Sequence, residues 1–165
     1  MARLVSRLVM FVVLLLVQVL VLNHVWLFNV ATPLLYVYFA ITFPRNTAKG
    51  EVLAWCFSLG LLIDIFSNTP GLASGTLTFV GMGQTYLLEF FVPRDSAENL
   101  ETSAATLGWG KFSMLSGIIA LVYCLIFFIL EAFNFFDWQL WILRAVCSAA
   151  LTLVLMLAIE SVRSK

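Results

Sequence analysis

Few side chains in this sequence have the types and the spacing that chemistry requires. The single histidine, His24, has no cysteine or carboxylate at metal-ligand spacing, and we expect it to be an interfacial polar residue. Cys56, Cys124 and Cys147 lie far apart in apolar runs, which predicts buried free thiols. The sequence has no phosphate-binding Gly-rich loop, no HExxH zinc motif and no nucleophile elbow. These features favour a protein that is not an enzyme and that uses no cofactor and no metal.

Two charged residues inside apolar runs are the candidates that remain. Asp64 follows Gly60-Leu61-Leu62-Ile63, and Arg144 lies within the last apolar run. A charged group at membrane depth is costly, so it usually faces the protein interior and has a partner. We predict that Asp64 and Arg144 pair near the outer surface, with Asp137 as the competing partner of Arg144. Asp64 has two further interpretations, a solvent-facing carboxylate or a cap for a helix that begins near Pro70.

Three glutamates lie near the ends of apolar runs, and we expect their carboxylates to reach water or lipid headgroups. They are Glu89, Glu131 and Glu160. Arg163 follows Glu160 by three residues, a spacing that allows an ordinary ion pair on one helix.

The composition requires a lipid environment around these residues. Of the 165 residues, 62% are hydrophobic and 11% are charged, and the mean hydropathy is +1.04. An ordinary soluble domain is roughly 45–50% apolar and about 25% charged. Nine Lys and Arg balance nine Asp and Glu, so no net charge attracts phosphates. A soluble enzyme, a disordered tail and a nucleic-acid binder are therefore excluded.

Charged and turn-forming residues divide the apolar sequence into six pieces of about the length that crosses a membrane. We predict one membrane domain, residues 1–165, in which the first helix is retained because no small-x-small cleavage site follows it. The polar segment 93–111 is expected to form a short interfacial helix, a cytoplasmic contact surface or a solvated loop. The predicted spans are 6–23, 28–43, 51–66, 72–92, 112–132 and 138–161.

Basic residues are distributed asymmetrically over this topology. Eight of the nine Lys and Arg fall on one side of the predicted membrane, and the loops near 23–28, 67–71 and 133–137 contain none. The positive-inside rule therefore predicts that both termini are cytoplasmic. The eight are Arg3, Arg7, Arg45, Lys49, Arg94, Lys111, Arg163 and Lys165, with Arg144 as the exception.

A short motif in the middle of the chain resembles that of a known family. Gly60-Leu61-Leu62-x-Asp64, followed by Pro70-Gly71-Leu72, is similar to the signature of the rod shape-determining protein MreD family. The run Pro33-Leu34-Leu35-Tyr36 resembles the family's second helix. The chain length, the basic N-terminus and the predicted cytoplasmic termini resemble the family in layout. No family pattern covers the region after the fourth predicted helix.

The resemblance implies a non-catalytic protein of the bacterial inner membrane that acts in the cell-elongation machinery. It implies an all-α integral membrane fold similar to the substrate-binding (S) component of energy-coupling-factor transporters. The implied partners are an MreC-like scaffold, cell-wall synthesis enzymes and an MreB-like filament, with surrounding membrane lipid. Gly60, Asp64 and Gly71 match the motif and would have a packing or partner-binding role.

The same layout leaves a second function class open. An S component of a vitamin transporter would hold its ligand in an outward-facing pocket, where several polar groups converge. The candidate residues for such a pocket are Asp64, Ser67, Asn68, Arg144 and His24.

Overall fold

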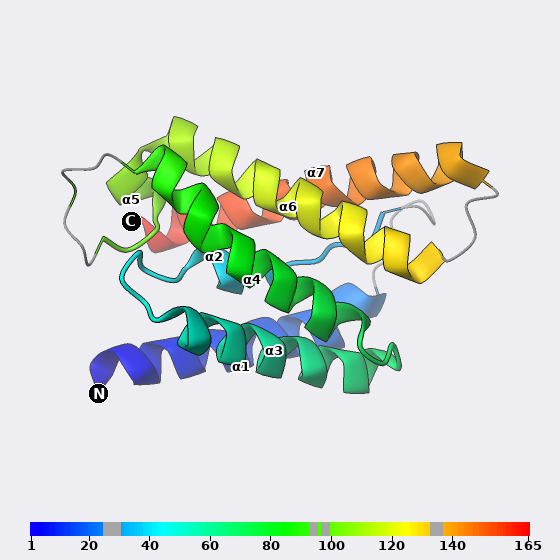
Figure 1. Ribbon diagram of the computed structural model, residues 1–165, viewed down its shortest axis with the longest axis horizontal. Coiled ribbons are helices and arrows are strands. Elements are labelled where there is room, and N and C mark those ends of the chain that lie inside the picture. The colour runs from blue at the N-terminus through cyan, green and yellow to red at the C-terminus, as the bar shows by residue number, and fades with distance from the viewer. Residues whose placement is uncertain (25–30, 93–95, 97–99, 133–136) are drawn as a thin grey trace.

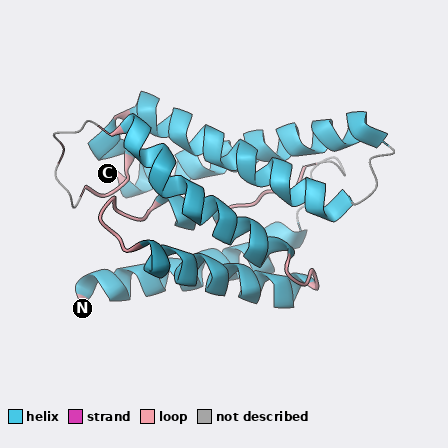
Figure 2. Ribbon diagram, in the orientation of Figure 1, coloured by secondary structure: helices cyan, strands magenta, loops and turns pink. Residues whose placement is uncertain are grey.

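Five long helices and three short ones form the part of the chain that the computed structural model describes: residues 1–24, 31–92, 96, 100–132 and 137–165. No β-strand occurs among these residues, and Figure 2 shows helices joined by loops. The elements are α1 (Ala2–Leu20), η1 (Leu22–His24), α2 (Val37–Ile41), α3 (Lys49–Ser67), α4 (Leu72–Phe91), α5 (Ala104–Leu107), α6 (Trp109–Ala132) and α7 (Trp138–Arg163).

The long helices run side by side along the long axis of the molecule, and both termini lie at the same end (Figure 1). Helix α4 packs between α3 and α6; α1 continues the series beyond α3, and α7 continues it beyond α6. The short helix α2 lies in the centre, in contact with α1, α3, α4 and α6. We call the end of the bundle that holds both termini the basic end, and we call the opposite end the distal end.

Within the described ranges, four helical segments are long and apolar enough to cross a membrane: Ala2–His24, Lys49–Ser67, Trp109–Ala132 and Trp138–Arg163. Helix α4 has a similar length, but its polar side chains, including Gln84 and Glu89, make it less apolar. Long helices occupy five of the six ranges predicted as spans. Together these features indicate an all-helical membrane protein.

The predicted helix over 28–43 is wrong in most of its described part. Residues 25–30 lie outside the described residues, residues 31–36 are not helical, and helix occurs only over α2. Pro33 has no backbone N–H and disfavours a helical conformation in the residue before it. The segment 34–41 is nevertheless buried throughout. Non-helical backbone is tolerated at membrane depth when surrounding protein supplies its hydrogen bonds.

Candidate functional site

The Asp64 carboxylate caps the beginning of α4. It lies near the end of α3 and is only 4% exposed. Oδ1 accepts the backbone N–H of Ala73 at 2.8 Å, and Oδ2 accepts that of Ser74 at 2.9 Å. The hydroxyl of Thr69 donates to Oδ1 at 3.1 Å. The carboxylate thus occupies a helix N-terminus, where unpaired N–H groups and the helix dipole favour negative charge.

Two glycines allow α3 and α4 to meet around this carboxylate. A Cβ atom at Gly60 would lie 2.7 Å from the backbone nitrogen of Ser74 and 2.8 Å from the carbonyl oxygen of Ala73. Only glycine therefore permits this approach of the two helices. Gly71 precedes α4 with φ 81°, a left-handed conformation that glycine adopts without strain. The three motif residues Gly60, Asp64 and Gly71 form one structural unit, which we call the α3–α4 hairpin.

The predicted ion pair between Asp64 and Arg144 is absent from the part of the chain that the structure describes. The alternative interpretation of Asp64, a cap for the helix that begins near Pro70, describes its position. Two backbone amides and one hydroxyl supply the hydrogen bonds that the arginine was expected to supply. Arg144 is exposed and lies beside a pocket at the distal end, together with Glu131.

The distal pocket brings several candidate polar residues together. Its volume is about 420 Å³, and its walls come from the ends of α1, α3 and α6, the start of α7 and the segment that begins at Ala31. Asn23 donates to the hydroxyl of Ser67 across one wall at 2.7 Å. Asn68 does not line the pocket but ends α3 with φ 55°. The polar lining residues are Asn23, His24, Thr32, Ser67, Thr69, Glu131 and Arg144.

Gln18, which is fully buried on α1, holds the non-helical segment from one side. Its Oε1 accepts the N–H of Leu35 at 3.0 Å, and its Nε2 donates to the carbonyl of Pro33 at 3.0 Å. One amide side chain thus pairs with backbone groups that would otherwise be unsatisfied in the interior.

Helix α7 holds the same segment from the other side. The hydroxyl of Ser148 accepts the N–H of Thr32 at 3.1 Å, and the hydroxyl of Thr152 accepts that of Leu34 at 3.1 Å. Ser148 and Thr152 are four residues apart, so they lie on one face of α7. With Gln18, they replace the hydrogen bonds that a continuous helix would have formed.

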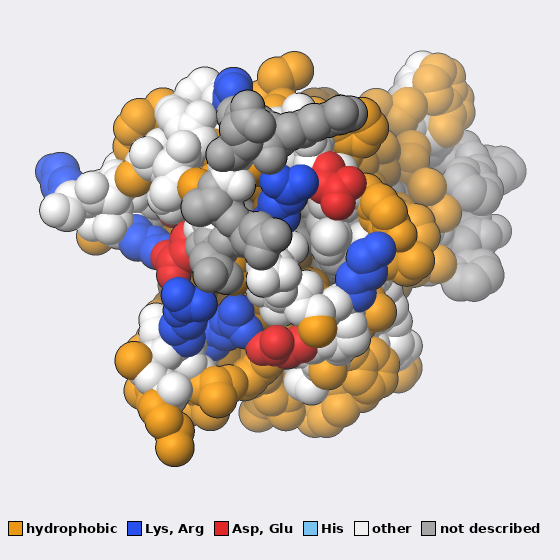
Figure 3. Space-filling view, turned by 60° about the vertical axis from the view of Figure 1, so that its left-hand side comes forward, with side chains coloured by type: hydrophobic (Ala, Val, Ile, Leu, Met, Phe, Trp, Pro, Cys, Tyr) orange, Lys and Arg blue, Asp and Glu red, His pale blue; other side chains and the backbone are white. Residues whose placement is uncertain are grey.

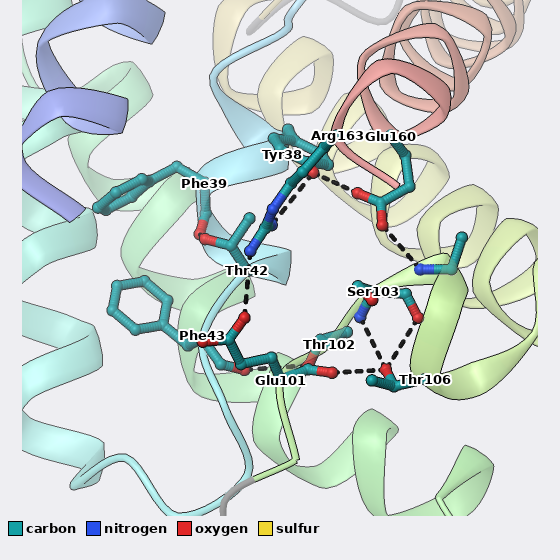
Figure 4. A network of polar contacts seen from close by, with 11 residues as sticks. Tyr38, Phe39, Thr42, Phe43, Glu101, Thr102, Ser103, Thr106, Glu160 and Arg163 are labelled. Carbon is teal, nitrogen blue, oxygen red and sulfur yellow. Dashed lines mark hydrogen bonds and ion pairs between the residues drawn. The ribbon is translucent and has the colours of Figure 1, made fainter. Parts of the chain in front are cut away.

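Glu160 is fully buried, so the prediction of a solvated carboxylate is wrong for this residue. Its Oε1 accepts the N–H of Ala104 at 2.7 Å, and its Oε2 accepts the hydroxyl of Tyr38 (Figure 4). Buried carboxylates are tolerated when such donors compensate the lost hydration. Glu160 therefore anchors the start of α5 to α7.

The predicted ion pair between Arg163 and Glu160 is absent from the described residues, although both side chains contact the hydroxyl of Tyr38. Arg163 donates to the hydroxyl of Tyr38 at 3.4 Å and to the carboxylate of Glu101 at 3.4 Å (Figure 4). Of the interpretations given for segment 93–111, a short helix is present as α5. Residues 93–95 and 97–99 of that segment lie outside the described residues.

No family model, curated protein or solved structure matches this chain. In the described part of the chain, no three His, Cys, Asp or Glu side chains are grouped closely enough to hold a metal ion. Cys56 and Cys124 are buried free thiols, and Cys147 is half-buried.

Sequence reasoning missed Gln18, Ser148, Thr152 and the buried position of Glu160, although each carries a detectable signal. Gln18 is the one amide in the apolar run from Leu8 to Leu22. Polar residues within apolar helices usually face protein rather than lipid. Ser148, Thr152 and Glu160 lie on a four-residue repeat of α7, which predicts one common buried face.

Proposed function

We propose that the chain is a non-catalytic component of the bacterial cell-elongation complex, which supports side-wall peptidoglycan synthesis by binding a single-span, MreC-like scaffold. The supporting observation is that Gly60, Asp64 and Gly71 act together in the α3–α4 hairpin. These are the residues on which the resemblance to the MreD family rests. A carboxylate that already accepts two backbone amides and a hydroxyl is suited to packing rather than to catalysis. Cell-wall synthesis enzymes and an MreB-like filament are the further partners proposed for this assembly.

The proposed topology has six passages through the bacterial inner membrane, with both termini in the cytoplasm and an arrangement similar to that of S components. The segment 31–43 takes the place of a second spanning helix, in the interior of the bundle. Charged side chains gather over the basic end, and hydrophobic side chains cover much of the flank in view (Figure 3). Basic residues favour the cytoplasmic side, which supports this orientation.

Helix α1 offers the best surface for a single-span partner. It is the least buried of the four candidate spans: 17% of an apolar stretch of 18 residues is buried, against 28–39% for the others. Leu8, Val12 and Leu16 are 40–54% exposed and follow one another at four-residue spacing. Such a stripe matches the way in which one helix packs along another. We propose that the scaffold's transmembrane helix lies on this stripe.

Photocrosslinking in living cells tests the proposal. A photoreactive amino acid at Val12 is expected to cross-link to a single-span protein, whereas the same group at Phe79, an exposed apolar residue of α4, gives no such product. Depletion of the protein is expected to turn rod-shaped cells round. Rod-shaped depleted cells, or cross-links from Val12 to a transporter ATPase, would contradict the proposed function.

The distal pocket favours a second candidate, an S component that binds a vitamin. Seven polar residues converge on a cavity of about 420 Å³, which lies within the size range of small-molecule sites. A vitamin that raises the melting temperature of the purified protein, together with a loss of that shift in Arg144→Gln, would support this candidate. Genes for an ATPase and for a coupling membrane protein next to the gene for this protein would also support this candidate.

A further inference from the structure

Three arginines surround a second pocket, at the basic end between α1 and α7. The pocket has a volume of about 230 Å³, and Arg3 and Arg7 of α1 face Arg163 of α7 across it. Ser6, Thr42 and Glu101 also line it. Nothing in the proposed function uses this pocket, because the scaffold-binding stripe lies on another face of α1.

The carboxylates around the pocket leave one guanidinium without a counter-charge. Arg7 forms an ion pair with Glu51 and donates to Thr47 at 3.4 Å. Arg163 forms an ion pair with Glu101 at 3.4 Å. Arg3 has no carboxylate partner among the residues that the structure describes. Arg3 is therefore the arginine of this pocket whose charge no described carboxylate neutralises in an ion pair.

An apolar groove continues from this pocket toward the middle of the bundle. It has a volume of about 610 Å³ and is lined by Val9, Val13, Ile159 and Val162, among others. Ser6, Met10 and Arg163 line both cavities, so the groove and the basic pocket are continuous. The groove lies between α1 and α7.

We propose that this composite site binds one anionic phospholipid, with its phosphate beside Arg3, Arg7 and Arg163 and an acyl chain in the α1–α7 groove. Arginine binds phosphate through paired N–H donors, and basic pockets between membrane helices on the cytoplasmic side suit anionic headgroups. A headgroup phosphate would supply Arg3 with the counter-charge that no described carboxylate supplies. An apolar partner helix would fill the groove but would leave Arg3 unpaired. The inference does not depend on the proposed function.

Lipid binding to the purified full-length chain in detergent tests this proposal. Native mass spectrometry with added phosphatidylglycerol is expected to show one retained lipid, whereas phosphatidylcholine at the same concentration is retained much less. Glycerol phosphate and inorganic phosphate serve as headgroup controls, and neither is expected to compete at millimolar concentration, because the acyl chain contributes to binding.

Two variants address the two halves of the site, each with a matched control. Arg3→Gln is expected to weaken phosphatidylglycerol binding about fivefold, and Lys111→Gln, which removes an exposed charge outside the pocket, is expected to leave it unchanged. Ala158→Phe places a ring in the groove and is expected to displace the lipid, whereas Ala150→Phe on the same helix is not.

Three outcomes would overturn the proposal. Equal retention of the two lipids would show that no anionic site exists. Competition by inorganic phosphate would show a plain anion site without a lipid groove. Unchanged lipid binding in Ala158→Phe, together with lost cross-linking to a single-span protein, would show that the groove holds a partner helix.

Discussion

At the scale of single residues, Asp64 shows how one carboxylate can organise a turn between two membrane helices. Its oxygens lie 2.8–3.1 Å from three donors, two of which are the backbone N–H groups of Ala73 and Ser74. Hydrogen bonds to a charged acceptor are stronger than neutral ones, and burial increases the cost of leaving these donors unpaired. The stability of the α3–α4 hairpin is therefore expected to depend on Asp64 rather than on a distant cation.

Substitution of Asp64 separates the two interpretations of this residue. We expect Asp64→Ala to lower the free energy of unfolding by about 2 kcal/mol, because three hydrogen bonds are lost. Asp64→Asn should cost less, since one carbonyl oxygen still accepts an amide. Arg144→Gln should change stability little, because Arg144 does not pair with Asp64. Thermal unfolding in detergent measures the stability of all three variants. An equal loss of stability in Arg144→Gln and Asp64→Ala would support the ion pair between Asp64 and Arg144.

Gly60 provides a second test at this scale. Gly60→Ala is expected to destabilise the protein by about 1–3 kcal/mol, because the new methyl group would overlap the backbone of α4 at Ser74. Gly75→Ala is the matched control, since no atom lies within 4 Å of the added Cβ. In a helix this second change is expected to be neutral or stabilising by up to about 1 kcal/mol. Equal melting temperatures for the two variants would argue against the close approach of α3 and α4.

At the scale of elements, the segment 31–43 is the unusual part of the fold. It contains a helix of only five residues, α2, which contacts the longer helices α1, α3, α4 and α6, and its residues 34–41 are buried. Backbone groups in residues 32–35 pair with Gln18 of α1 and with Ser148 and Thr152 of α7. Side chains from elements far apart in sequence thus replace local helical hydrogen bonds.

The dependence of this segment on α7 can be measured with two threonine variants. Thr152→Val removes the acceptor for the buried N–H of Leu34 and is expected to cost about 1–3 kcal/mol. Thr76→Val is the matched control, because the buried hydroxyl of Thr76 donates to the Leu72 carbonyl of its own helix and forms no hydrogen bond to another element among the described residues. Hydrogen exchange of residues 31–36 should be faster in Thr152→Val alone. Equal exchange in both variants would mean that α7 does not hold the segment.

At the scale of the whole molecule, the two ends of the bundle differ in chemistry. Arg3, Arg7 and Arg163 lie at the basic end, where both termini are found. The distal end has a polar pocket beside Glu131 and Arg144. In the proposed topology the basic end faces the cytoplasm, as the positive-inside rule favours, and the distal pocket then opens to the outside.

Cysteine labelling in intact cells checks this orientation. In a background with Cys56, Cys124 and Cys147 changed to Ala, Pro70→Cys at the distal end should react with a membrane-impermeant thiol reagent added outside. Ser164→Cys at the basic end should react only after the membrane is permeabilised. The reverse labelling pattern would mean that the protein is inserted in the opposite orientation.

The sequence alone determined the environment and the positions of most long helices. A composition of 62% hydrophobic residues requires lipid, and helices in lipid satisfy their own backbone groups, so apolar runs of sufficient length predict them directly. Long helices accordingly occupy five of the six predicted ranges. The residues of the α3–α4 hairpin were also visible, as a motif with Gly60, Asp64 and Gly71.

Only the tertiary structure decided which partners the polar residues have. Asp64 pairs with α4 rather than with Arg144, Glu160 is buried against Ala104, and residues 31–36 remain non-helical. A buried polar group pairs with the donor or acceptor that lies closest to it in space. For Glu160 that neighbour, Ala104, is 56 residues away along the chain, and spacing in the sequence does not give such distances in the fold.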